Sequence, residues 1–115
     1  MYLLNVSLLL ALLLSCGCAS KQLYSWGQYE DTIYSSYSTP DKMPVARQIE
    51  ILEADYQKAR AADKSVPPGW HAHLGYLYYQ TGNLDQAREH FRTEKALFPE
   101  ATVLMDRMLK NLEKT

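Results

Sequence analysis

Three histidines are the side chains of this sequence best suited to bind a metal ion or to transfer a proton. His71 and His73 are two residues apart in a segment with helical spacing, so they point to different sides of the helix and cannot share one ion. His90 lies in a later helical segment, and a site made by His73 and His90 would require a chance packing of the two helices. The spacing therefore predicts no metal site and no bound cofactor.

The sequence also lacks the common catalytic patterns. It has no Gly-rich phosphate-binding loop, no nucleophile elbow and no cluster with metal-ligand spacing. The acidic residues are spread along faces that we expect to be solvated, without paired partners. The charge is nearly balanced, with 12 basic and 13 acidic side chains among 115 residues, whereas a nucleic-acid-binding domain needs a clustered basic face. We therefore expect a single domain that is not an enzyme and binds no nucleic acid.

Two cysteines, Cys16 and Cys18, are the remaining side chains with distinctive chemistry. A disulfide or metal site of the Cys-x-Cys type is disfavoured, because neither a histidine nor a further cysteine lies nearby. The apolar run 3–14 precedes them. It is too short to span a bilayer, which needs about 20 residues, and it fits the apolar region of a secretory signal.

The segment Leu13-Leu14-Ser15-Cys16 resembles a bacterial lipobox, with Leu three residues before the cysteine and a small residue directly before it. The resemblance implies that signal 1–15 is removed, that the Cys16 thiol receives a diacylglycerol and that the new amine is acylated, for example by palmitate. Cys18 is the alternative, but it has Ser15 at the position where Leu is preferred.

Three acyl chains would anchor the protein permanently, since two already suffice. The residue after Cys16 is Gly17 and the residue after Cys18 is Ala19. Because neither is the aspartate that retains lipoproteins in the inner membrane, the resemblance implies the periplasmic leaflet of the outer membrane. Residues 16–25 would then form a lipidated tether.

Five amphipathic helices are expected in the domain 26–115. Apolar residues recur every three or four positions in 26–37, 43–63, 69–81, 84–97 and 101–112. Gly75 lies inside the third segment, where the missing side chain allows a neighbouring helix to approach closely. Gly82 suits a left-handed C-cap and Asn83 an N-cap. The short turn between them makes the third and fourth segments antiparallel neighbours.

The stretch from 70 to 99 resembles the tetratricopeptide (TPR) repeat, a helix–turn–helix unit. The residues that carry the resemblance are Trp70, Leu74, Gly75, Tyr78, Gly82, Ala87, Phe91 and Pro99. The sequence departs from the pattern at Glu94, where a small residue is usual. The resemblance implies an all-α fold of TPR-like antiparallel helical hairpins, in which 26–37 and 43–63 form a degenerate first repeat and 101–112 covers the last one.

In TPR proteins the first helix of each repeat lines a concave binding groove. Transferring those positions by resemblance places five residues in a partner groove: Ala72, His73, Tyr76, Tyr79 and Gln80. Tyrosines suit protein recognition because they bring a large contact area at a low entropic cost. An alternative is that Tyr76 and Tyr79 pack against the last helix or the first repeat.

The whole chain, including the opening Tyr24-x-Trp26-Gly27-x-Tyr29, resembles a family of small bacterial lipoproteins of unassigned function. The resemblance implies a non-catalytic scaffold that interacts with envelope proteins, including other lipoproteins, in a curli-like secretion assembly. Two alternatives stay open: a regulator of a periplasmic enzyme such as a peptidoglycan synthase, or a carrier of a hydrophobic ligand. So few repeats also suggest completion by a partner or by a second copy of the chain.

Overall fold

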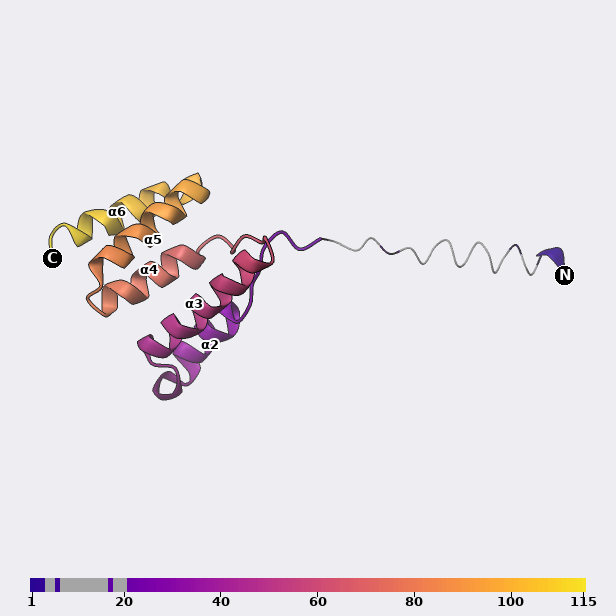
Figure 1. Cartoon of the computed structure of the whole chain (residues 1–115), viewed down its shortest axis with the longest axis horizontal. Coiled ribbons are helices and arrows are strands. Elements are labelled where there is room, and N and C mark those ends of the chain that lie inside the picture. Colours follow the sequence, from indigo (N-terminus) through magenta and orange to yellow (C-terminus); the bar gives the residue numbers. More distant parts are fainter. Residues whose placement is uncertain (4–5, 7–16, 18–20) are drawn as a thin grey trace.

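The computed structural model describes residues 1–3, 6, 17 and 21–115. Within these residues the protein is all-helical, which confirms the predicted fold class (Figure 1). Five α-helices and two 3₁₀-helices follow one another in this part: α2 (Tyr29–Ser38), η1 (Pro40–Lys42), α3 (Val45–Ala61), α4 (Trp70–Gln80), α5 (Leu84–Leu97), η2 (Pro99–Ala101) and α6 (Thr102–Leu112).

The proposed lipidation residues Cys16 and Cys18, together with most of the predicted signal 1–15, lie outside the described residues. Among the helices that are described, none combines the length and the apolar character that crossing a bilayer requires. The segment before α2 is fixed to the loop between α3 and α4, because the Ser25 amide donates to the Ser65 carbonyl over 2.7 Å.

The first hairpin, α2 and α3, is shorter than the predicted segments 26–37 and 43–63. Helix α2 begins at Tyr29 because Gly27 has a positive φ of 48°, which a regular helix cannot contain. Helix α3 begins at Val45 because Pro44 is extended, with φ −64° and ψ 159°. The two helices lie side by side in Figure 1 and run in opposite directions across the short connection η1.

The second hairpin, α4 and α5, contains a close helix contact at Gly75. A Cβ atom on Gly75 would lie 2.7 Å from Phe91 Cε1, so only glycine allows the observed approach. Gly82 supplies the left-handed turn with φ 79°, and the Asn83 side chain accepts a hydrogen bond from the Gln86 amide. These observations confirm the predicted roles of the two glycines and of Asn83.

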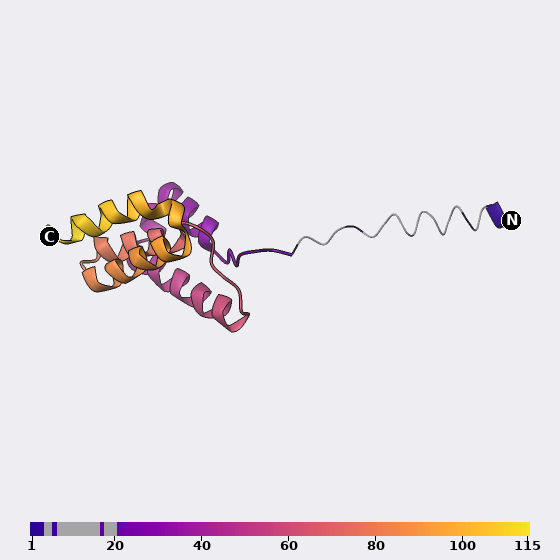
Figure 2. The ribbon, with the colours of Figure 1, turned by 90° about the horizontal axis from the view of Figure 1, so that it is seen from above.

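Helix α6 packs along α5, as the view from above shows (Figure 2). Two apolar clusters result, one on each side of α4. The first cluster, between α3 and α4, contains Leu52, Ala59, Val66, Trp70, Leu74 and Leu77. The second cluster, between α5 and α6, contains Ala87, Phe91, Met105 and Leu112. Helix α4 is therefore the central element of the domain, and side chains of α4 contact both clusters.

Candidate functional site

An open cavity of about 390 Å³ lies between α4 and the first hairpin. Its floor is apolar, with Val45 of α3 and Leu77 of α4, and its rim carries aromatic side chains, including the exposed Tyr37 and Tyr76. The full set of lining residues is Ser36, Tyr37, Pro40, Met43, Pro44, Val45, Gln48, His73, Tyr76, Leu77 and Gln80. We call this space the α2–α4 cavity.

Two of the residues that line the α2–α4 cavity carry a polar atom without a hydrogen-bond partner among the described residues. These atoms are Gln48 Oε1 and His73 Nε2, and both are shielded from solvent, so they do not face the open cavity. The Gln48 side chain is fixed at its other end, because Nε2 donates to the Met43 carbonyl over 3.0 Å. Burial lowers the pKa of His73, which keeps the imidazole neutral near pH 7. A buried polar atom without a partner costs free energy, so these two atoms lower the stability of the packing between α3 and α4.

The structure divides the five predicted groove residues between two surfaces. His73, Tyr76 and Gln80 line the α2–α4 cavity. Ala72 and Tyr79 instead pack against the second cluster under α6. At about 100° per residue, positions 72 and 79 lie close to position 76 and further from positions 73 and 80. The two surfaces therefore meet at Tyr76, whose ring stacks on that of Tyr79 with centroids 6.4 Å apart.

Residues that carry the TPR resemblance occupy structural positions. Trp70, Leu74, Ala87 and Phe91 are buried in the two clusters. Trp70 stacks on Tyr56, with ring centroids 5.2 Å apart.

The remaining signature residues shape the ends and the contacts of the helices. Tyr78 is half-buried, and its hydroxyl donates to Glu53 over 2.8 Å. Pro99 begins η2, directly after the end of the second hairpin.

A buried histidine pair, which the sequence reasoning did not find, joins α4 to α5. His71 Nδ1 and His90 Nδ1 are 2.9 Å apart, and the exposed fractions of the two residues are 3% and 8%. Burial and the neighbouring His90 lower the pKa of His71 to about 4. Burial also lowers the pKa of His90, opposed by the negative charges of Glu53 and Glu89. The pair is a neutral polar contact in the core and does not line the α2–α4 cavity.

The prediction that all acidic side chains lie on solvated faces is wrong for two residues. Glu94, only 2% exposed, accepts hydrogen bonds from the amides of Gly69 and Ala72 at the start of α4, over 2.6 and 3.2 Å. Asp55, which is 8% exposed, accepts a hydrogen bond of 2.6 Å from the amide of Gln28 at the start of α2. Each carboxylate satisfies amide groups that a helix start leaves without partners. The one signal in the sequence was Glu94 at a position where TPR repeats have a small residue.

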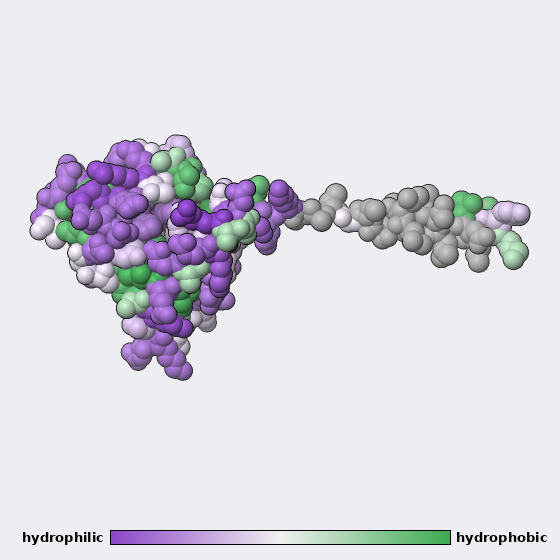
Figure 3. Space-filling model, viewed as in Figure 1, coloured by the Kyte–Doolittle hydropathy of each residue, from purple (hydrophilic) through white to green (hydrophobic). Residues whose placement is uncertain are grey.

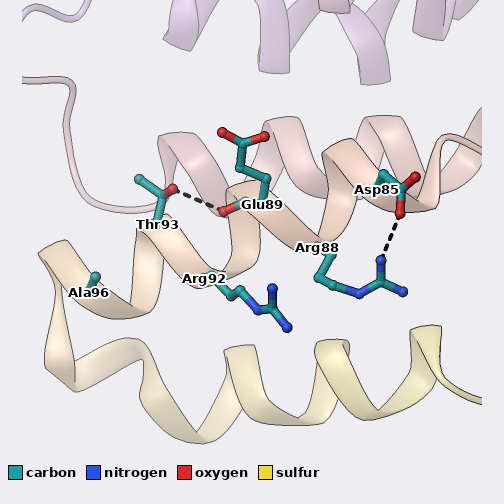
Figure 4. A pocket seen from close by; sticks show the side chains of 6 residues that line it. All are labelled: Asp85, Arg88, Glu89, Arg92, Thr93 and Ala96. Atoms are coloured by element: carbon teal, nitrogen blue, oxygen red, sulfur yellow. Dashed lines mark hydrogen bonds and ion pairs between the residues drawn. The ribbon is translucent and has the colours of Figure 1, made fainter.

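A second, shallower cavity lies on the outer surface of α5, and Figure 4 shows its lining. Arg88 binds Asp85 over 2.8 Å, and the Thr93 hydroxyl donates to the Glu89 carbonyl over 2.9 Å. Glu89 points away from Arg88 and Arg92 in this view. The charged groups of this surface are exposed and partly neutralised along their own helix, which is typical of a solvated helix face.

Apolar side chains are also exposed at both ends of the domain. Figure 3 shows a hydrophobic patch where α5 passes into α6, and Leu97, Val103 and Leu104 of this region are 54%, 76% and 55% exposed. On α2, Tyr34 and Tyr37 are 73% and 85% exposed. The α2–α4 cavity differs from both patches because side chains of three helices, α2, α3 and α4, line it, and we therefore take it as the candidate site.

The fold and this cavity define a class of protein: a small all-α domain of stacked helical hairpins with a neutral, partly apolar cavity beside its central helix. The chain belongs to the family defined by a domain of unknown function, DUF4810, whose model matches residues 23–108. The matched range includes α2 to α5 and most of α6. No curated protein and no solved structure matches the sequence.

Proposed function

We propose that this protein is an envelope lipoprotein whose TPR-like domain binds another envelope protein and catalyses no reaction. An acyl chain on Cys16, or on Cys18 in the alternative, would hold it at the periplasmic leaflet of the outer membrane. The lipobox resemblance supports the anchor, and stacked helical hairpins, which form extended concave surfaces in repeat proteins, support a role in protein binding. The partner would belong to a secretion or envelope assembly, as the resemblance to small lipoproteins implies.

The observation that carries the proposal is the α2–α4 cavity, which is lined by side chains from α2, α3 and α4. The exposed rings of Tyr37 and Tyr76 border it, and His73 also lines it. Tyrosine and histidine beside an apolar floor offer both contact area and hydrogen bonds to a partner segment.

The proposal is tested by photocrosslinking in cells that produce the full-length protein. A photoreactive phenylalanine analogue replaces Tyr76 at the cavity rim, or Gln57 on an exposed part of α3 as the matched control. We expect a discrete adduct with an envelope protein from position 76 and none from position 57. Equal adducts from both positions, or none from either, would reject the assignment of the cavity as the partner site.

A substitution test complements the crosslinking. Tyr76→Ala combined with Gln80→Ala removes two rim side chains that belong to neither apolar cluster, although the Tyr76 ring also stacks on Tyr79. The adduct captured from a third rim position, Tyr37, should then decrease strongly. Tyr79→Ala is unsuitable for this purpose, because Tyr79 packs under α6 and its loss would also destabilise the domain.

A further inference from the structure

Exposed apolar side chains gather where α5 passes into α6. Leu97 is the last residue of α5, and Val103 and Leu104 stand in the first turn of α6. More than half of each residue is accessible to solvent, and the patch is visible in Figure 3. We call these three residues the α5–α6 patch. Single exposed apolar residues are normal in a soluble domain, but a group of them indicates a contact with a protein or a membrane.

The segment that precedes α2 runs beside this patch. The Tyr24 ring packs edge-on against the Phe98 ring, with centroids 6.2 Å apart. Phe98 stands between Leu97 and η2, so this contact fixes the segment next to the α5–α6 patch. Leu23, the residue before Tyr24, is 81% exposed and adds a fourth apolar side chain. The chain therefore continues toward its N-terminus from the place at which these apolar side chains gather.

The proposed lipid anchor would keep the patch close to a membrane. Cys16 precedes Tyr24 by eight residues and Cys18 precedes it by six. A chain spans at most about 3.6 Å per residue, so Tyr24 lies no more than about 29 Å from an acylated Cys16 and about 22 Å from an acylated Cys18. Such a short tether raises the effective concentration of the leaflet surface at the patch, so that even a weak contact forms.

The polarity around the patch matches the headgroup region of a leaflet. Beyond Leu104, the exposed residues of α6 include Asp106, Arg107 and Lys110, so only the first turn of this helix is apolar on its outer side. Glu100 is exposed in η2, and its carboxylate would lose its water in the hydrocarbon core. The apolar side chains can therefore enter the headgroup region while their charged neighbours stay hydrated. Charges of both signs are present, so the contact requires no excess of anionic lipid.

We propose that the α5–α6 patch docks on the lipid leaflet that holds the acyl anchor, with Leu97, Val103 and Leu104 in the headgroup region. This inference rests on the proposed function, because the anchor is what brings the patch to the membrane. It adds a second, non-covalent contact with the same leaflet. Two contacts at one end of the domain fix its orientation, whereas a tether alone would leave the domain free to rotate.

The docked orientation leaves the α2–α4 cavity accessible. Glu94, near the end of α5, accepts a hydrogen bond from the Gly69 amide at the start of α4, so the α5–α6 patch lies toward the start of α4. The cavity instead includes Tyr76 and Gln80 from the second half of α4. The membrane contact and the cavity thus lie toward opposite ends of the central helix, and a partner can reach the cavity from the side away from the lipid.

The test places a photoreactive phenylalanine analogue at Val103 of the full-length chain, in cells whose phospholipids are radioactively labelled. Tyr34 on α2 is the matched control position, because the exposed fractions of the two residues are 76% and 73%. Helices α2 and α6 lie at opposite ends of the row of helices in Figure 1. We expect position 103 to give at least about fivefold more lipid adduct than position 34, because a side chain in the headgroup region is surrounded by lipid.

A variant of the patch checks that its apolar side chains make the contact. The photoreactive residue then replaces Leu97, and Val103→Ser is combined with Leu104→Ser. Both substituted residues are exposed, so the domain should keep its fold. We expect about fivefold less lipid adduct from position 97, because two apolar side chains no longer favour the contact. Tyr34→Ser, which removes an exposed ring outside the patch, should leave the adduct from position 97 unchanged.

Three results would overturn the inference. They are equal lipid adducts from positions 103 and 34, an adduct of position 103 with another protein or a second copy of the chain in place of lipid, and unchanged lipid adducts in the double serine variant. Fatty-acid labelling of the same chains distinguishes this failure from a failure of the proposed function. A chain without fatty acid would reject the anchor and the docking together, whereas an acylated chain with any of the three results would reject the docking alone.

Discussion

Asp55 and Glu94 occupy equivalent positions in the two hairpins. Asp55 lies ten residues after Val45, the first residue of α3, and Glu94 lies ten residues after Leu84, the first residue of α5. Each carboxylate accepts a hydrogen bond from the amide of the residue that stands directly before the first helix of its hairpin. This residue is Gln28 for α2 and Gly69 for α4. The same hydrogen bond between a carboxylate and an amide therefore connects the second helix of each hairpin to the start of the first helix. This equivalence supports the proposal that the hairpins are two copies of one repeat.

We expect removal of either carboxylate to destabilise the domain. Glu94→Ala leaves two amides at the start of α4 without partners in a buried place and should lower the free energy of unfolding by about 2 kcal/mol. Asp55→Ala should lower it by about 1–2 kcal/mol, because it removes one such bond. Urea denaturation followed by circular dichroism measures both. Glu89→Ala, an exposed change on α5, is the control and should change stability by less than about 0.5 kcal/mol.

Gly75→Ala should be strongly unfavourable, although alanine normally stabilises a helix interior by about 1 kcal/mol relative to glycine. The new Cβ would lie 2.7 and 2.8 Å from two carbons of the Phe91 ring and 3.2 Å from the Ala87 carbonyl oxygen. We expect a loss of about 2 kcal/mol in the free energy of unfolding, as for other overpacked cores.

Two variants separate this steric effect from a backbone effect. Gly82→Ala meets no atom within 4 Å but has φ 79°, so its cost of about 1 kcal/mol comes from the backbone alone. Gly75→Ala combined with Phe91→Leu should recover part of the loss, because the smaller side chain can move aside. Additive losses in the double variant would contradict the steric explanation.

The buried histidine pair predicts a loss of stability in acid. Folding lowers the pKa of His71 from 6.5 to about 4, so the unfolded chain binds the proton more tightly than the folded one. The stabilisation is complete above pH 6.5 and is lost as the pH falls from 6.5 to about 4, by at most about 3 kcal/mol. Denaturation at a series of pH values measures this slope, and His71→Asn should reduce it.

An NMR titration assigns the effect to individual residues. The His71 ring should titrate near pH 4, while His73 and His90 should also titrate below their ordinary pKa because both are lowered by burial. A His71 ring that titrates near pH 6.5 in the folded protein would show that it is not held between α4 and α5 as described.

The hydrogen bond from Tyr78 to Glu53 should be visible in alkali. Burial, together with the hydrogen bond and negative charge of Glu53, raises the pKa of Tyr78 to about 12. The corresponding stabilisation is present below pH 10 and is lost as the pH rises from 10 to about 12. In an ultraviolet titration of the tyrosines, the component that titrates near pH 12 should be absent from Tyr78→Phe. In Glu53→Gln the same component should move to lower pH. Tyr34→Phe, which removes an exposed hydroxyl, should leave it in place.

The proposed anchor is tested on the precursor. Cys16→Ala should accumulate as an unprocessed, non-acylated chain, because the lipidated thiol is lost. Cys18→Ala should be processed and acylated as the wild type is. Metabolic labelling with a radioactive fatty acid distinguishes the two cysteines, and normal labelling of Cys16→Ala would transfer the assignment to Cys18.

The sequence predicted those parts of the fold that depend on local patterns. The recurrence of apolar residues every three or four positions predicted the helices, since burial of one face requires that spacing. Gly75 predicted a close helix approach, and the structure places the Phe91 ring against it. The predicted starts of α2 and α3 were less accurate. Both helices begin later than the amphipathic pattern does, because Gly27 and Pro44 have backbone angles that a helix does not contain.

The site could be predicted only in part, because it depends on the relative placement of distant segments. Gln48 reaches the α2–α4 cavity from α3, and no local pattern distinguishes it from an exposed glutamine. His71 and His90 meet although they are nineteen residues apart. Transfer of groove positions by resemblance could not tell which of the five residues line the same cavity, and Ala72 and Tyr79 pack against the second cluster.

The placement of the two capping carboxylates has a consequence for how the protein is made. A polypeptide emerges from the ribosome with its N-terminus first, so α2 emerges before Asp55 and α4 emerges before Glu94. The start of each leading helix therefore lacks its carboxylate partner until the following helix has also emerged. Both helices of a hairpin must therefore emerge before the hairpin is complete. An interruption of synthesis between the two helices would release the first helix without the carboxylate that accepts a hydrogen bond at its start.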